Sequence, residues 1–472
     1  MDSVKAKRAL KGSSNKINMC EGAILPLIIR FSVPLMITGI LQVLFNAADI
    51  MVVGNFGSDH SLAAVSATGS LTSLIVNLFI GLSVGTNVLC ARFFGAKDDK
   101  SLSETVHTSI TLSLIIGTLL TVVGLVFSEP LLRMMSVPEE VLPLSALYMR
   151  IYFCGMIPSL VYNFASSVLR AVGDTKRPMY FLTLAGVLNV LLNLLLVMVF
   201  KMDVAGVAIA TIASQTVSAV LVVICLMRET EDIRLHVKKL RVSMKILPQL
   251  IGIGLPAGLH STMFSLANVV IQSSLNTFGP DVMAGSGAAS SIESLLFTAL
   301  GAIYQAVVAF TSQNYGRYNF KRILKAHILG QVIVYTFGFA LCVITVIFAE
   351  PLLGMFADKP AEIAAGVDKM RKVGLFVFVY ASSDIAIATL RGLGCSLTPM
   401  ITSLICVCGA RILWIATVFQ LPQFHNVSGL YTSFPVSYFL SLGVQMICMI
   451  VFFRIKVKKY GHLYQAIDSA VA

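Results

Sequence analysis

The chain has 472 residues, of which 57% are hydrophobic and only 12% are charged, and its mean hydropathy is +0.86. Soluble proteins carry about 25% charged residues, so this chain has too few charges to cover several soluble domains. The composition excludes a soluble enzyme, a disordered chain and a secreted disulfide scaffold, and it predicts a polytopic membrane protein.

Apolar segments follow one another along most of the chain. Residues 1–18 are polar and basic and lack the apolar core of a cleaved signal peptide, so we expect the first apolar helix to target the membrane. A span needs about 20 apolar residues. The pattern predicts an all-α membrane protein with twelve transmembrane helices, at 25–53, 61–90, 105–127, 143–168, 179–199, 204–227, 248–278, 282–310, 327–349, 373–390, 399–419 and 429–453.

The basic residues predict the orientation of these helices. The net charge is +12, and 26 of the 35 Lys and Arg residues fall on the side of the N-terminus, whereas six fall in the opposite connectors. Basic loops stay in the cytoplasm, so both termini are expected there and the chain in the cytoplasmic (inner) cell membrane. The basic stretch 228–245 is predicted to be a linker on the anionic inner leaflet.

The two halves of the chain are repeats. Pro34 matches Pro256 at an offset of 222 residues, and Glu129-Pro130-Leu131-Leu132 matches Glu350-Pro351-Leu352-Leu353 at 221. Each half has six spans, so the repeats are parallel and related by an axis along the membrane normal. We therefore predict two pseudo-symmetric lobes around a central cavity. The expected parts are a tail at 1–20, an N-lobe at 21–227, a linker at 228–247, a C-lobe at 248–455 and a tail at 456–472.

Asp49 is the most informative polar residue inside a predicted span. An acidic residue at mid-bilayer costs about 2.5–3.5 kcal/mol on insertion scales, so we favour a functional role over a structural one. Gln42, Asn46 and Asp49 share one face of span 1, and Asn189 and Asn193 share one face of span 5. A carboxylate and amide oxygens can bind Na⁺ at Asp49, Asn189 and Asn193, or the carboxylate can carry a proton.

This polar set is absent from the second repeat. Asp49 corresponds to Ile271, and the two asparagines correspond to Ala410 and Trp414. Structural hydrogen bonds would more plausibly be duplicated with the fold. We therefore expect ion coupling to reside in the N-lobe.

The C-lobe has its own polar residues, with open interpretations. Glu293 could meet a cationic substrate, carry a second proton, or be a carboxylate held by neighbouring serines near a helix end. Asp384 could lie deep or near a cavity mouth. Asn268, Gln272 and Asn276 form a stripe that we expect to line the substrate cavity, together with Gln42 and Asn46.

The sequence lacks motifs for ATP hydrolysis, metal binding and intramembrane catalysis. No GxxxxGK[ST] sequence or Gly-rich phosphate loop is present, so we expect an ion gradient rather than ATP to supply energy. The nine cysteines lack metal-site spacing. An intramembrane enzyme would need a nucleophile, histidine or metal cluster at one depth, and the histidines are scattered. We expect no enzyme activity, no cofactor besides Na⁺ or H⁺, and no nucleic-acid partner.

Four stretches together resemble the multidrug and toxic-compound extrusion (MATE) family. They are Ala47–Gly54, Leu169–Pro178, the asparagine pair and Ser312-Gln313-Asn314-Tyr315-Gly316, within a likeness from about Ile24 to Ile455. The resemblance implies a twelve-helix efflux antiporter in the lipid bilayer that exports cationic or amphipathic drugs in exchange for Na⁺ or H⁺. We expect a monomer. A lipid-linked oligosaccharide flippase is the alternative, although few basic residues lie within the spans.

The resemblance also implies roles for residues. Asp49 matches the coupling aspartate, Asn189 and Asn193 match cation-site positions, and Thr211 matches a ligand position in span 6. Glu293 resembles a span 8 acidic residue of bacterial members. Two C-lobe acids of some Na⁺-coupled members are replaced by Phe264 and Tyr380, and we place Tyr380 and Asp384 at the substrate cavity.

Overall fold

The computed structural model is helical and describes residues 16–58, 60–135, 137–229, 233–356 and 359–471. In these residues, 11 helices are long and apolar enough to cross a membrane, and the number rises to 12 if one bent pair counts as a single span. That pair, α5 (Leu142–Cys154) and α6 (Met156–Ala171), bends by 45°. The prediction of an all-α fold with about twelve spans is confirmed, and predicted span 4 is a broken helix.

The chain divides into two compact units. The N-terminal unit comprises residues up to Asn18 and Ile37–Gly258, and the C-terminal unit comprises Met19–Met36 and residues from Leu259 onward. Two helices, α2 (Ile24–Phe56) and α9 (Leu247–Leu275), therefore contribute to both units. The repeat mates Pro34 and Pro256 lie inside these helices, close to the positions where the assignment changes.

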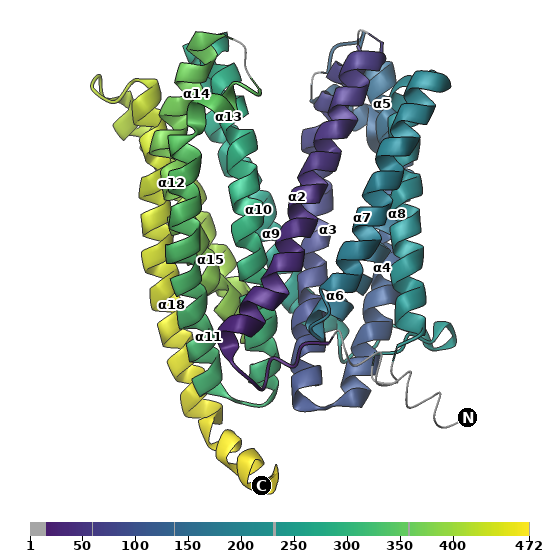
Figure 1. The fold of residues 1–472 in the computed structure, drawn as a ribbon, viewed down its shortest axis with the longest axis vertical. Helices are drawn as coiled ribbons and strands as arrows, with labels where there is room; N and C mark the ends of the chain where they lie inside the picture. The colour runs from purple at the N-terminus through teal and green to yellow at the C-terminus, as the bar shows by residue number, and fades with distance from the viewer. Residues whose placement is uncertain (1–15, 59, 136, 230–232, 357–358, 472) are drawn as a thin grey trace. The chain divides into compact units, whose positions relative to one another are not determined.

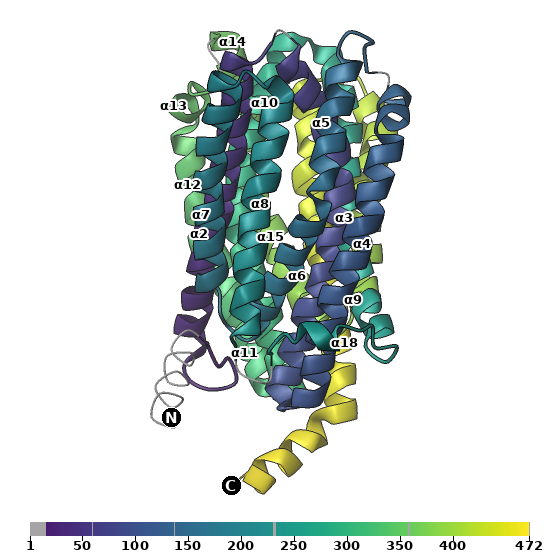
Figure 2. The ribbon, with the colours of Figure 1, turned by 90° about the vertical axis from the view of Figure 1, so that its right-hand side faces the viewer.

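Helices of the N-terminal unit run side by side along a common direction (Figures 1 and 2). Strongly apolar sequences of more than 20 residues form most of them, so each can bury one face against its neighbours and leave the other for lipid. Besides α5 and α6, they are α3 (Ser61–Ala96), α4 (Asp99–Met134), α7 (Lys176–Asn193) with a π-helical continuation (Leu194–Val199), and α8 (Asp203–Met227).

The C-terminal unit has helices of the same kind, several of them interrupted. Its apolar core gathers around Tyr380, Tyr431 and Tyr438. Its helices are α10 (Pro280–Gly316), α11 (Phe320–Ile333), α12 (Phe339–Ile347), α13 (Ala349–Leu353), α14 (Pro360–Lys372), α15 (Val377–Gly392), α16 (Leu397–Ser403), α17 (Ala410–Ala416) and α18 (Val427–Val471).

The two repeats share backbone details at the ends of their helices. Gly173 and Gly394 have φ values of 90° and 84°, a region that favours glycine. After each glycine, the next backbone N–H donates to a leucine carbonyl at 2.9 Å, from Asp174 to Leu169 and from Cys395 to Leu390. The repeat inferred from the sequence is therefore also present in the turns.

Glycines allow α3 and α9 to approach closely within the N-terminal unit. Gly81 and Gly85 on α3 face Gly254 and Gly258 on α9. A Cβ at Gly81 would overlap the backbone of Gly258, and a Cβ at Gly254 would lie 2.7 Å from the carbonyl oxygen of Leu82. In lipid, apolar burial alone gives helices little preference for one another over the lipid tails. Small residues at this spacing let the backbones of two helices come into contact, which favours their association.

Gly258→Ala should lower the apparent Tm of the protein in detergent. Its new methyl group would overlap the backbone of Leu78, and overpacking of this kind costs about 1–3 kcal/mol. Gly252→Ala on the same helix is the matched control. A Cβ there meets nothing within 4 Å, so helix propensity should stabilise that variant by up to about 1 kcal/mol. Equal Tm shifts in the two variants would contradict the close approach.

An ion-pair cluster joins three segments of the N-terminal unit at the start of α7 and just after the end of α8. Arg177 contacts both Asp174 and Glu229, and Nζ of Lys16 lies 3.1 Å from Oε2 of Glu229. Burial raises the pKa of the Glu229 carboxyl, but the Arg177 hydrogen bond and the Lys16 charge lower it more, so the pKa lies below its usual 4.5. The charged form of Glu229 therefore stabilises the folded unit.

Glu229→Gln should reduce stability at neutral pH and have less effect in acid. A depressed pKa stabilises the fold above the unfolded value of about 4.5, and this contribution is lost as the pH falls through the folded value. The apparent Tm of wild type and variant should therefore converge as the pH falls below about 4.5. Glu140→Gln, which removes an exposed carboxylate, is the control. A Tm difference that stays constant with pH would exclude this contribution.

Candidate functional site

The structure brings together the four residues assigned to cation coupling. Asp49 on α2, Asn189 and Asn193 on α7, and Thr211 on α8 form a connected chain of hydrogen bonds. Nδ2 of Asn193 donates to Oδ1 of Asp49 and lies 3.4 Å from Oδ1 of Asn189. Nδ2 of Asn189 donates to Oγ1 of Thr211 at 3.4 Å, and Thr211 donates to the carbonyl of Val207 at 3.0 Å.

This site is rich in oxygen atoms, and it is buried at the asparagines but only half-buried at Asp49 and Thr211. Asn193 is fully buried and Asn189 is 5% exposed. Oδ1 of Asn193 is buried with no hydrogen-bond partner in the described part of the chain. Asp49 has no Lys, Arg or His within 4.0 Å among the described residues. Because an unpaired buried oxygen and a half-buried carboxylate without a counter-charge are costly, the site favours a proton or a small cation.

A cavity of about 90 Å³ adjoins Asp49. A buried water needs roughly 10–15 Å³, whereas sites for drug-sized ligands measure about 300–1,000 Å³. The cavity can therefore hold an ion with a few waters but not a drug. Its lining includes the other residues of the predicted stripe; the lining residues are Gln42, Phe45, Asn46, Asp49, Leu182, Ala185, Gly186, Asn189, Thr211, Ser214, Gln215 and Ser218.

Sequence reasoning missed two tyrosines near this site. Tyr148 and Tyr152 on α5 interact electrostatically with Asp49, and their rings stack with centroids 6.0 Å apart. Their spacing of four residues places both on one face of α5. That spacing was a usable signal, but in an apolar helix it is equally typical of core or lipid contact.

Glu293 lies in a buried ion pair within the C-terminal unit. Nζ of Lys369 on α14 is 3.4 Å from Oε2 of Glu293 on α10, and less than a tenth of either side chain is exposed. The same nitrogen donates to the carbonyl of Ser286 at 3.1 Å and to Oγ of Ser290 at 2.5 Å. The sequence had placed Lys369 in a connector, because α14 was not predicted as part of a span. The serines near Glu293 thus contact its lysine partner.

Arg411 on α17 is a second buried base that sequence reasoning left without a role. It is 1% exposed and lies 4.2 Å from the ring centroid of Phe434. Its NH1 donates to Oδ1 of Asn268 at 2.8 Å, its Nε donates to Oγ of Ser437 at 3.1 Å, and its NH2 has no partner among the described residues. The predicted cavity residue Asn268 is therefore engaged by a guanidinium group.

The remaining C-lobe candidates form no hydrogen bond with Arg411 in the described part of the chain. Tyr380 is 6% exposed, packs against Phe264 with ring centroids 5.1 Å apart, and interacts electrostatically with Arg411. Asp384 is half-buried and interacts electrostatically with Arg391. Gln272 is exposed and donates at 2.9 Å to Asn276, which directly follows the end of α9. No group of three His, Cys, Asp or Glu side chains in the described residues could hold a metal ion.

The comparison with family models finds one match. The MatE model matches residues 34–195 and 256–416, one segment in each repeat. The two segments together cover more than half of the chain, so both halves carry the family pattern.

Curated relatives and solved structures agree with this match. The probable multidrug resistance protein YoeA of Bacillus subtilis is 26% identical over 87% of this chain and 90% of its own length. The FAD transporter of Shewanella oneidensis is also 26% identical, over 87% of this chain and 91% of its own length. A multidrug resistance MATE transporter in an outward-facing conformation has a TM-score of 0.87 at 24% identity, over 94% of this chain and 99% of that one.

Lys369→Met should destabilise the protein strongly. It would leave Glu293 buried without its counter-charge, a change that costs about 3–5 kcal/mol. The double variant with Glu293→Gln should recover much of the loss, because no uncompensated charge remains. The apparent Tm in detergent measures both effects. Lys359→Met, which removes an exposed lysine, should change it little. If Lys369→Met and Glu293→Gln changed the Tm additively, this would contradict an interaction between the two side chains.

Proposed function

The chain belongs to the MatE family of multidrug and toxic-compound extrusion transporters, and we propose that it is a cation-coupled efflux antiporter. A transporter needs no catalytic cluster, and the long apolar helices suit a multi-pass membrane protein. We further propose that it resides in the cytoplasmic membrane with both termini inside, and that lobes 21–227 and 248–455 alternate in exposing a substrate site.

The observation that carries the coupling proposal is the chain of hydrogen bonds from the half-buried Asp49 to Thr211. Its carboxylate is hydrogen-bonded by Asn193 and has no basic partner in the described residues, so nothing there permanently neutralises its charge. A proton would neutralise Asp49 directly. Na⁺ would use oxygens of Asp49, Asn189 and Thr211, and a turn of the Asn193 amide would supply a fourth oxygen.

Cation movement is coupled to substrate movement if the cation binds the inward-facing and the outward-facing state of the transporter with different affinity. An ion shifts a conformational equilibrium only by that difference. With Asp49 neutralised, closing its surroundings avoids burying a charge, whereas the free carboxylate favours a state open to water or to a cationic substrate. One charge crossing 100 mV supplies about 2.3 kcal/mol, enough for a gradient of roughly fiftyfold.

Cationic or amphipathic small molecules are the proposed substrates. YoeA and the structural neighbour are described as multidrug resistance proteins, which supports this class. The 90 Å³ cavity beside Asp49 is too small for such molecules, so we assign Asp49 to coupling rather than to direct drug binding.

Dye efflux from proteoliposomes tests the proposal. Wild type should export a cationic dye under an imposed Na⁺ or H⁺ gradient, tested separately, and Asp49→Asn should lose at least about tenfold of the gradient-driven rate because an amide cannot hold a proton at this position and binds Na⁺ weakly. Asp99→Asn, an exposed carboxylate on α4, should keep the wild-type rate. Efflux by Asp49→Asn that still follows the gradient would exclude this coupling role.

A second candidate function is export of an anionic compound, and Arg411 favours it. Its buried guanidinium has an unpartnered nitrogen, which suits a carboxylate or phosphate group. The Shewanella relative is described as an FAD transporter. A lipid-linked oligosaccharide flippase, the alternative from the sequence, would also move phosphate groups. The same proteoliposomes loaded with FAD instead of dye distinguish anion export from drug export.

A further inference from the structure

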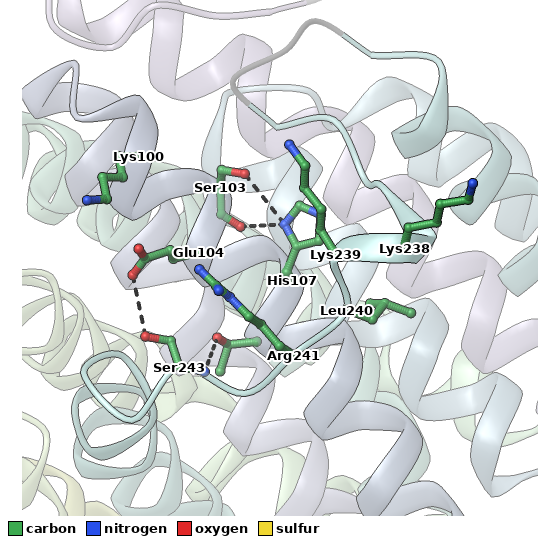
Figure 3. A pocket seen from close by; sticks show the side chains of 10 residues that line it. Lys100, Ser103, Glu104, His107, Lys238, Lys239, Leu240, Arg241 and Ser243 are labelled. Atoms are coloured by element: carbon green, nitrogen blue, oxygen red, sulfur yellow. Dashed lines mark hydrogen bonds between the residues drawn. The ribbon is translucent and has the colours of Figure 1, made fainter.

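A second and larger pocket lies in the N-terminal unit, away from Asp49. Residues 238–243 follow α8 and lie beside the first turns of α4 (Figure 3). Together they enclose a cavity of about 540 Å³. Its lining residues are Lys100, Ser103, Glu104, His107, Thr108, Lys238, Lys239, Leu240, Arg241 and Ser243.

This pocket has a strong excess of positive charge. Lys100, Lys238, Lys239 and Arg241 line it, against a single carboxylate from Glu104. In the described part of the chain, none of these four bases forms an ion pair within 4.0 Å. All four side chains are exposed, so water partly screens their mutual repulsion, and an anion between them would lower it further. The missing counter-charge points to an anionic ligand.

The segment that carries three of these bases is fixed to α4 by hydrogen bonds. The backbone N–H of His236 donates to Nε2 of His107 at 3.1 Å, and that of Ser243 donates to Oγ1 of Thr108 at 3.1 Å. The hydroxyl of Ser243 donates to Glu104 at 3.4 Å, and the imidazole rings of His107 and His236 stack. His107 is only 4% exposed. The bases therefore project from a positioned backbone.

We propose that this pocket binds the phosphate group of an anionic ligand, with the headgroup of an anionic membrane phospholipid as its occupant. Lysine, arginine and hydroxyl groups are the donors that recognise phosphate oxygens. The volume lies within the range of small-molecule sites. The pocket lies beside the start of α4, a predicted span, so it lies near the membrane surface on the side that we propose to be cytoplasmic. Basic segments at this position attract anionic lipids.

Such a ligand would link the segment after α8 to α4 through charge. It would neutralise Lys239 and Arg241 on one side and Lys100 on the other. Because the existing hydrogen bonds already hold the segment, the bound phosphate adds stability rather than creating the fold. This site is independent of the coupling chain at Asp49, so its failure would leave the antiporter proposal untouched.

The test measures thermal stabilisation of the full-length protein in an uncharged detergent at low salt. The probes are a short-chain phosphatidylglycerol, a phosphatidylcholine of equal chain length, and inorganic phosphate. Phosphatidylglycerol should raise the apparent Tm of wild type with a saturable dependence, whereas phosphatidylcholine should have little effect. The double variant Lys239→Gln, Arg241→Gln should need roughly tenfold or more phosphatidylglycerol for the same shift.

Two controls keep this test decisive. Arg454→Gln with Lys458→Gln removes two exposed charges from α18 and should respond like wild type. Arg241→Lys retains the charge and should recover most of the response if the double variant folds poorly. Inorganic phosphate could raise the apparent Tm of wild type but not of the double variant, while neither lipid has an effect. That result would support the anion site but assign it to a soluble ligand. Equal responses of wild type and the double variant to every probe would overturn the site.

Discussion

The cost of removing charge from water among apolar helices governs this structure. Each buried charged group must find hydrogen-bond donors, a counter-ion or a way to become neutral. Asp49 and Glu293 meet this constraint differently. An asparagine amide donates to Asp49, which leaves its charge uncompensated, whereas Lys369 pairs with Glu293. The first arrangement suits reversible binding of a cation, and the second suits a fixed structural contact.

Glycine and small hydroxyl residues make these arrangements possible. Gly81 and Gly258 let α3 and α9 approach closely, which keeps the N-terminal unit closely packed beside a polar interior. The hydrogen-bonded chain from Asp49 to Thr211 borders a cavity of only about 90 Å³. A cavity of this size limits the water around Asp49, which strengthens the interaction of its carboxylate with a bound cation.

Much of this could be predicted from the sequence, because hydropathy and repeats are strong signals in membrane proteins. The helical architecture and the family resemblance are confirmed. Asn189 and Asn193 share a face of one helix at i, i+4 spacing, and Asp49 shares a face of another helix with Gln42 and Asn46. Long-range partners could not be predicted. Lys369 pairs with Glu293 from a position 76 residues further along the chain, and Arg411 contacts Asn268 across 143 residues. Periodicity within one helix carries no information about which helix lies opposite.

The matching turns of the two repeats have an evolutionary consequence. Gly173 and Gly394 preserve one backbone conformation, while Asp49 and Ile271 occupy equivalent positions with opposite chemistry. A duplicated frame lets one copy carry a charged group at a position where the other copy carries an apolar side chain. Selection can then change the chemistry at such a position in one lobe without changing its mate in the other.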